Sequence, residues 1–144
     1  MATARELLDR KGHKIFSVPP SATAHDSAKV MCENGIGAVL VLDDGALVGI
    51  FTERDALRRV VVPGHDPRAT RVEDVMTKAM VTCVPETSLD ECGAIMTTRR
   101  IRHLPVVDEK GLHGLVSIGD LLATRVAEQE DTIKFLNDYM FQTR

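Results

Sequence analysis

The heptapeptide Gly49-Ile-Phe-Thr-Glu-Arg-Asp55 is echoed 65 residues later by Gly114-Leu-Val-Ser-Ile-Gly-Asp120. In both copies a glycine is followed by two apolar residues and a hydroxyl residue, and an aspartate lies three positions after the hydroxyl. Similarity that recurs at a fixed offset is typical of a duplicated structural unit. These two stretches therefore predict two copies of one folding unit.

The same offset also aligns the residues around both stretches. Ile15–Leu57 matches Met80–Leu122 without a gap. Identical residues occur along the alignment at Pro20/Pro85, Met31/Met96, Ile36/Ile101, Val41/Val106, Asp43/Asp108, Leu47/Leu112 and Leu57/Leu122. The duplicated unit therefore extends well beyond the motif.

The pattern in each copy predicts the order β-α-β-β-α. A short apolar run ends at a proline, which cannot donate to a ladder, and a hydroxyl residue three positions before a carboxylate then predicts a capped helix. Two further apolar runs, separated by turn-forming Asp and Gly residues, predict a hairpin that leads into a second helix. The expected strands are Ile15–Val18, Ala38–Leu42 and Leu47–Phe51 in the first unit and Met80–Val84, Leu104–Val107 and Leu112–Val116 in the second. The expected helices follow Thr23 and Thr52 in the first unit and Ser88 and Ser117 in the second. The first helix of each unit is expected to end near Asn34 or Arg99.

Composition indicates a small globular chain with an aliphatic core. The 144 residues are 44% hydrophobic and 27% charged, and only 3% are aromatic. A chain of this size can bury its apolar surface as one domain or as two halves that share a core, whereas two independent domains would be marginal. The fold class that we expect is α/β (α+β), in one compact module.

Charge and cysteine content argue against several classes of protein. A net charge of −3 gives no electrostatic reason for a nucleic-acid partner, which calls for a basic surface. Neither the three cysteines nor the five histidines have the spacing of a disulfide framework or a metal site. The charged N-terminus lacks the apolar run of a signal peptide, and no segment reaches the about 18 apolar residues of a membrane span. We therefore expect a cytoplasmic protein with no membrane partner, no nucleic-acid partner and no metal.

The hydroxyl and the aspartate of the repeated motif allow two interpretations. Thr52 with Asp55, and Ser117 with Asp120, have the spacing of a capping box. A helix N-terminus also favours an anion, so the hydroxyl can help to hold phosphate while the aspartate accepts hydrogen bonds from a ribose. The glycine that opens each motif indicates either a bulge or a close backbone approach. The residues alone leave capping and nucleotide binding both open.

The chain resembles a tandem pair of cystathionine-β-synthase (CBS) domains, a Bateman module. The resemblance rests on the two G-h-h-[ST]-x-x-D segments, on VEDVMT at Val72–Thr77 and on IRHLPVVD at Ile101–Asp108, and it covers roughly residues 3–126. It implies two β-α-β-β-α units related by a pseudo-twofold axis. It also implies two clefts between the units that bind an adenine nucleotide, namely AMP, ADP, ATP or NAD, with no catalytic cofactor.

The resemblance places ligand-binding residues in both units. Asp55 and Asp120 would hold ribose. The residues expected near phosphate are Thr52, Arg54 and Ser117, beside Glu53, Ile118 and Gly119. Those expected to flank adenine are Ile15, Ser17, Val18, Met80, Thr82 and Val84. The same clefts would be lined by Gly37, Ala38, Arg102, His103, Leu104 and Pro105. Because the first site has Arg54 where the second has Gly119, we expect unequal affinities.

The function that we expect is a stand-alone regulatory module for signal transduction or energy sensing, which acts in trans on an unknown protein effector. No nucleophile or metalloenzyme signature is present, so we expect no enzyme. Two alternatives stay open: an enzyme that hydrolyses or transfers part of a nucleotide, and a structural dimerisation scaffold with empty clefts. The basic cluster Arg99–His103 indicates either a solvated turn or phosphate recognition.

The expected boundaries are residues 3–62 for the first CBS domain, 63–71 for a linker, 72–128 for the second domain and 129–144 for a helical extension. Apolar residues recur at spacings of three and four in this last helix, at Leu122, Val126, Ile133, Leu136 and Met140, with Gln129 interrupting the series. The stripe packs either on the module or on a second chain. The resemblance favours a homodimer.

Overall fold

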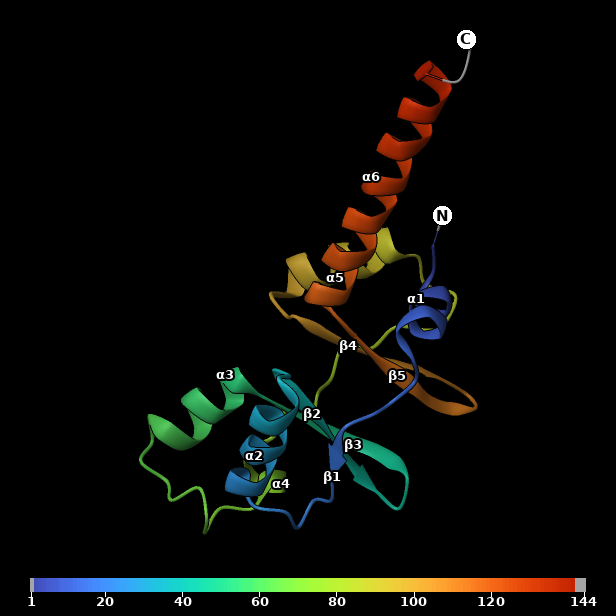
Figure 1. Ribbon diagram of the computed structural model, residues 1–144. Coiled ribbons are helices and arrows are strands. Elements are labelled where there is room, and N and C mark those ends of the chain that lie inside the picture. Colours follow the sequence, from blue (N-terminus) through green and yellow to red (C-terminus); the bar gives the residue numbers. More distant parts are fainter. Residues whose placement is uncertain (1, 142–144) are drawn as a thin grey trace.

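Two small sheets face each other in the computed structural model, which describes residues 2–141 (Figure 1). The first sheet has the strand order β1-β2-β3 and the second pairs β4 with β5. In chain order the elements are α1 (Ala4–Lys11), β1 (Ser17–Val18), α2 (Ala24–Asn34), β2 (Ala38–Asp43), β3 (Ala46–Thr52), α3 (Glu53–Asp55), η1 (Ala56–Val61), α4 (Val72–Val75), α5 (Leu89–Arg99), β4 (His103–Asp108), β5 (Gly111–Ser117) and α6 (Ile118–Phe141).

The first sheet is buried on both faces. β1 runs parallel to β2, and β2 pairs with β3 in antiparallel fashion. Successive side chains of a strand point to opposite faces. Val39 and Val41 accordingly pack in the core of the first unit, whereas Ala38 and Leu40 face the second sheet. The predicted strands are confirmed here, although β1 begins later than expected.

The second sheet lacks the strand that was expected at Met80–Val84, and this prediction is wrong. In the described part of the chain, only Cys83 of this run forms an isolated parallel bridge to β4. The cause is Pro105, which stands where the first unit has Leu40. The Leu40 N–H donates to the Phe16 C=O at 3.1 Å, and proline has no N–H for the equivalent bond.

The first helix of each unit begins and ends where the sequence predicts. Thr23 caps α2 in a complete capping box with Asp26, and Gly35 ends the helix in the left-handed conformation at φ +61°. The Ser88 side chain accepts a hydrogen bond from the Glu91 N–H at the start of α5. Local capping chemistry therefore marks the ends of these helices.

Each unit is completed by a short helix that the other repeat supplies. In α1, Ala4, Leu7 and Leu8 are at most 3% exposed and share a core with β4, β5 and α5 of the second unit. In return, Val72 and Val75 of α4 join the core of the first unit. The two units thus exchange equivalent helices, and the core of each unit contains residues from both repeats.

The glycines that open the two motifs make room for the exchanged segments. A Cβ at Gly49 would lie 2.8 Å from Cγ of Met76, and a Cβ at Gly114 would lie 2.8 Å from Cδ2 of Leu8. The ladder also shifts register next to each glycine. The side chain that approaches Gly49 is therefore Met76, which follows α4, and the side chain that approaches Gly114 is Leu8 of α1.

The two sheets share an apolar core between them. Ala38, Leu40 and Ile50 are at most 6% exposed and pack with partly buried residues of both units. These partly buried residues are Ile15, Leu42, Leu47, Met80, Leu112 and Leu115. The units consequently form one compact module, as the composition predicts.

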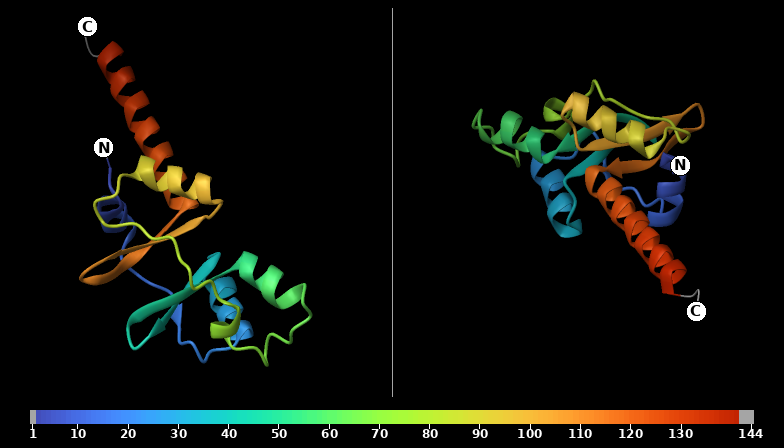
Figure 2. Two further views of the ribbon diagram at one scale, coloured as in Figure 1. Left: turned by 180° about the vertical axis from the view of Figure 1, so that it is seen from behind. Right: turned by 90° about the horizontal axis from the view of Figure 1, so that it is seen from above.

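The helices that follow the two motifs differ in length. In the first unit α3 continues as the π-helix η1, which ends at Val61. In the second unit α6 runs for 24 residues to Phe141 and projects away from the body (Figures 1 and 2). This confirms the expected long helix, of which residues 142–144 lie outside the described residues. Within residues 2–141, no helix is both long and apolar enough to cross a membrane.

Candidate functional site

Asp55 is held inside the fold by its capping box and by the exchanged segment. Its carboxylate accepts a hydrogen bond from the Thr52 N–H at 3.0 Å, and its own N–H donates to Thr52 Oγ1 at 3.2 Å. Thr77, which follows α4, donates its hydroxyl to Asp55 Oδ1 at 2.9 Å. Only 6% of Asp55 is exposed. Protein groups therefore satisfy this carboxylate, and a ribose would have to displace Thr77 to reach it.

Asp120 has the same local geometry but is more open. The Ser117 N–H donates to Asp120 Oδ2 at 2.9 Å, and the Asp120 N–H donates to Ser117 Oγ at 3.1 Å. Lys11 Nζ from α1 donates to the same Oδ2 at 2.7 Å. The Asp120 side chain is 24% exposed. Within residues 2–141 no protein group donates to its other oxygen, Oδ1, which leaves one face of the carboxylate for a ligand.

The residue after the hydroxyl in each motif, Glu53 or Ile118, meets the start of the middle strand of its unit, at the junction of the two units. The Glu53 N–H donates to the Gly37 C=O at 3.1 Å, and the equivalent bond runs from the Ile118 N–H to the Arg102 C=O at 2.9 Å. Across the junction, a Cβ at Gly37 would lie 3.5 Å from His103 Cε1. Five of the predicted site residues, from both units, are therefore close together.

Burial is the main cause that holds the pKa of His103 below its ordinary value of 6.5. The nearby carboxylates of Glu53 and Asp120 oppose this shift, whereas Arg102 and Lys11 reinforce it. The imidazole at the junction is therefore neutral near pH 7. A ligand in this place would meet a neutral ring between cationic and anionic side chains.

Acidification below pH 6.5 is expected to destabilise the protein through His103, because the unfolded chain then takes up a proton that the folded chain does not. The contribution is complete above the unfolded pKa of about 6.5 and is lost as the pH falls toward the lower folded pKa, with a slope of at most about 1.4 kcal/mol per pH unit. Urea unfolding of the parent and of His103→Gln at about pH 5 and about pH 7 measures it.

The His103→Gln variant should lose less stability than the parent over this pH range. Exposed His13 acts in the opposite sense, because its hydrogen bond to Asp9 raises its pKa. That contribution is the same in both proteins and cancels in the comparison. Equal losses in parent and variant would contradict the burial of a neutral imidazole at the junction.

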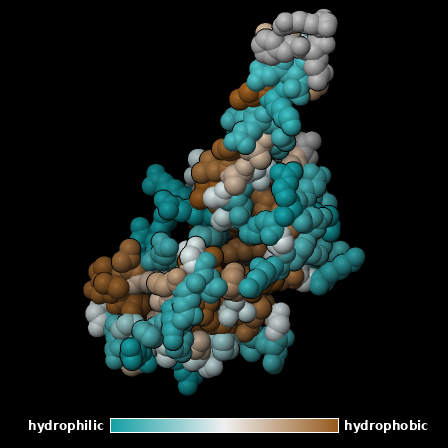
Figure 3. Space-filling model, in the orientation of Figure 1, coloured by the Kyte–Doolittle hydropathy of each residue, from teal (hydrophilic) through white to brown (hydrophobic). Residues whose placement is uncertain are grey.

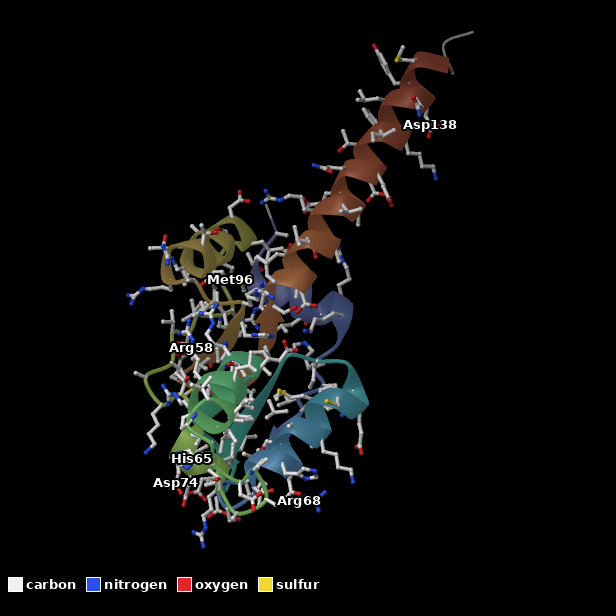
Figure 4. All side chains as sticks on the ribbon, turned by 90° about the vertical axis from the view of Figure 1, so that its left-hand side faces the viewer. Arg58, His65, Arg68, Asp74, Met96 and Asp138 are labelled. Carbon is white, nitrogen blue, oxygen red and sulfur yellow. The ribbon has the colours of Figure 1, made fainter. Side chains whose placement is uncertain are left out.

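A hollow of about 230 Å³ opens at the same junction. Arg54 from the first unit and Arg100 and Arg102 from the second line it. Arg54 Nη1 donates to the Arg100 C=O at 2.8 Å and so bridges the units. The other lining residues are Met96, which Figure 4 labels on α5, Thr97, Ile101 and Ile118. Guanidinium groups beside an apolar wall suit a ligand that is anionic at one end and apolar at the other.

The remaining predicted residues are divided between surface and core. Three of those expected beside adenine are exposed, namely Ser17, Thr82 and Val84. Ile15 and Met80 pack in the core between the sheets. Val18, Ala38, Leu104 and Pro105 are buried, and Gly119 is exposed on the first turn of α6. The buried members can offer a ligand only their backbone groups.

Two cations of the site were not assigned to it from the sequence. Arg100 belongs to the basic cluster Arg99–His103, for which the sequence leaves a solvated turn and phosphate recognition both open, and it ends α5 in the left-handed conformation at φ +54°. Lys11 reaches the site only because α1 packs on the second unit, which the repeat does not reveal. Among residues 2–141, no three His, Cys, Asp or Glu side chains are grouped so that they could hold a metal ion.

Comparison with known proteins identifies relatives over most of the chain. A family model described as the CBS domain matches residues 4–62 and 72–126. The "CBS domain-containing protein CBSX3, mitochondrial" of Arabidopsis thaliana is 41% identical over 123 residues, which cover 82% of this chain and 60% of that protein. The chain therefore spans less than two thirds of the length of this relative.

Solved structures share the fold. A protein with CBS domains from Burkholderia ambifaria MC40-6 has a TM-score of 0.84 at 44% identity, over 89% of this chain and 96% of that one. The CBS domain protein PAE2072 from Pyrobaculum aerophilum, which was solved in complex with AMP, has a TM-score of 0.73 at 24% identity, over 83% and 89% of the two chains. At this identity the likeness to PAE2072 concerns the fold alone.

Proposed function

The chain belongs to the CBS-domain family and carries the domain twice in tandem, and from this premise we propose that it is a regulatory module that binds an adenine nucleotide at the junction of its two units. AMP, ADP and ATP are the ligands proposed first, and NAD is a further adenine-containing candidate. Ligand binding would favour one state of the module and so alter its action on a protein effector in trans, which requires different affinities for the two states.

The convergence of three arginines on one hollow carries the proposal. Arg54, Arg100 and Arg102 lie in a protein whose net charge is −3, so their grouping is not a consequence of a generally basic surface. Guanidinium groups pair with phosphate oxygens in a bidentate geometry. The apolar wall of the hollow, formed in part by Ile101 and Ile118, supplies the kind of surface on which a base can pack.

The two motif aspartates support unequal binding. Asp120 lies two residues after Ile118 of the hollow and keeps one carboxylate oxygen free of protein donors within residues 2–141. Asp55 is closed off by Thr77. We therefore propose that the stronger site takes its ribose from Asp120, and that binding at Asp55 requires a local rearrangement of the segment after α4.

Asp120→Ala is expected to remove one binding event when AMP or ATP is titrated in a calorimeter. For the parent, saturating ligand should also raise the free energy of unfolding, by about 2.7 kcal/mol at a hundredfold excess over Kd. Asp55→Ala is the comparison, since loss of its buried hydrogen bonds should lower the melting temperature even without ligand.

The alternatives give different results in the same experiments. Product after incubation with ATP or NAD, seen by chromatography, would identify an enzyme, whereas the proposed module leaves both nucleotides intact. A parent protein whose melting temperature is unchanged by AMP, ADP, ATP and NAD would be a structural scaffold. If Asp120→Ala titrates like the parent, the assignment of ribose to Asp120 is wrong. The cytoplasmic location expected from the sequence stays a prediction.

A further inference from the structure

The outer part of α6 has no packing partner among the described residues. The helix is anchored by its first turns, where Leu121 packs on the core of the second unit and Thr124 is 8% exposed. Arg125 adds an ion pair with Asp90 at 2.7 Å. From Glu128 to Met140 every residue is exposed. The 24-residue helix spans about 36 Å, and its outer half stands clear of the body in both views of Figure 2.

An apolar stripe runs along this free helix. Leu122, Val126, Ile133, Leu136 and Met140 are between 49% and 62% exposed, and Figure 3 shows hydrophobic atoms at intervals along the projection. At roughly 100° per residue, the centre of the stripe lies about a quarter of a turn from Leu121 and farther from Thr124, and both of these residues face the body. The stripe therefore cannot pack on its own module, and of the two possibilities left by the sequence only an external partner remains.

We propose that this stripe is the seam of a parallel two-stranded coiled coil formed with α6 of a second copy of the chain. The spacing fits a heptad repeat, in which Val126, Ile133 and Met140 occupy the a positions and Leu122, Gln129 and Leu136 occupy the d positions. β-Branched residues at a with leucine at d favour two parallel strands over three or four. The occupant is therefore an identical helix in the same direction.

The polar residue in the seam specifies the same orientation. Gln129 is the one polar residue among the six a and d positions. In a parallel pair with both helices in register, Gln129 faces Gln129 of the second copy, and the two amides can donate to and accept from each other. In an antiparallel pair that keeps the apolar contacts, Gln129 would face Ile133 and would be buried without a partner, which costs free energy.

Charges that flank the seam agree with this orientation. Arg125 lies at a g position and Glu130 at the following e position, and these are the positions that form ion pairs between parallel helices. In the antiparallel arrangement, Glu130 would instead lie opposite Glu130 of the second copy, a repulsive contact. The present pair of Arg125 with Asp90 is exposed on both sides, so exchanging it costs little.

Ile133→Asp in the full chain is expected to convert a dimer into a monomer in sedimentation equilibrium at micromolar concentration. The matched control is Phe135→Asp, which introduces the same charge at a residue that is 67% exposed on the same helix but outside the heptad seam. Phe135→Asp should remain dimeric. Neither residue contributes to the described cores, and melting curves should show that both variants fold.

Cross-linking tests the orientation. In a Cys32→Ser background, which removes the one exposed cysteine, Gln129→Cys should form a disulfide-linked dimer on mild oxidation, since the two residues at one d position face each other. Arg125→Glu should weaken the dimer, and adding Glu130→Arg should restore it.

Three results would overturn the proposal: a monomeric parent, a dimer that survives Ile133→Asp, or a dimer that cross-links only when Gln129→Cys is mixed with Ile133→Cys. The first two exclude the seam and the third excludes the parallel orientation. The inference concerns α6 alone, so each of these results leaves the proposed nucleotide site unaffected.

Discussion

Leu8→Ala is expected to lower the free energy of unfolding by about 2–5 kcal/mol, the range for truncating a buried leucine. Leu8 lies before the first strand of the first unit, yet it is 1% exposed and packs in the core of the second unit. Urea unfolding followed by circular dichroism measures the change. Leu57→Ala is the matched control, because Leu57 is 59% exposed and its loss should change stability by less than about 0.5 kcal/mol.

The contact of Leu8 with Gly114 adds a second test of the exchanged helix. Gly114→Ala alone forces a methyl group against the Leu8 side chain and should cost about 1–3 kcal/mol. In the Leu8→Ala background the clash is removed and the new methyl group partly fills the cavity, so the two changes together should cost less than their sum. Strict additivity, or a Leu8→Ala variant as stable as Leu57→Ala, would contradict the packing of α1 on the second unit.

The local parts of the fold could be predicted because their causes are local. Thr23 and Gly35 mark the ends of α2 through capping alone, and the hairpins follow from alternation and turn residues. The missing strand was also visible in principle. Pro105 replaces Leu40 in the repeat, and a proline without an N–H weakens the pairing of any strand beside it.

The exchange of helices could not be predicted from the repeat. The similarity of Arg5–Leu8 to Glu73–Met76 shows that the two segments are equivalent, but either segment could cover either unit, since the apolar faces of the two units are alike. In the folded chain, α1 packs on the second unit and α4 packs on the first. This arrangement also decides which side chains reach the motifs, because Lys11 and Thr77 both belong to the exchanged segments.

This exchange explains why two nearly identical motifs have different environments. Thr77 follows Met76 in one segment and has a hydroxyl that reaches Asp55. Asp9 follows Leu8 in the other segment, and its carboxylate pairs with His13 at 2.8 Å instead. The Asp9 carboxylate has no proton to donate to Asp120, whereas the Thr77 hydroxyl donates to Asp55. The carboxylate of Asp120 is therefore bound by Lys11 on one oxygen only, and the motif alignment contains no sign of this difference.

Removal of an arginine that lines the hollow is expected to weaken the recognition of phosphate. Arg102→Ala should weaken the binding of AMP and ATP by about 10- to 100-fold, because a hydrogen bond to a charged group contributes about 1.5–3 kcal/mol and 1.4 kcal/mol is a factor of ten. Arg102 is exposed and lines the hollow, so its removal opens no core. Titration calorimetry with AMP, ATP and adenosine measures the effect, and adenosine, which has no phosphate, should bind the parent and the variant alike.

The control for this loss is Arg99→Ala. Arg99 belongs to the same basic cluster and is exposed, but it does not line the hollow. Both variants remove one positive charge, so any general electrostatic attraction of the nucleotide falls equally in both. Arg54→Ala should behave like Arg102→Ala, because Arg54 reaches the hollow from the first unit through its bond to the Arg100 carbonyl. If Arg99→Ala and Arg102→Ala weaken AMP binding equally, net charge accounts for the attraction and the hollow is not where the phosphate binds.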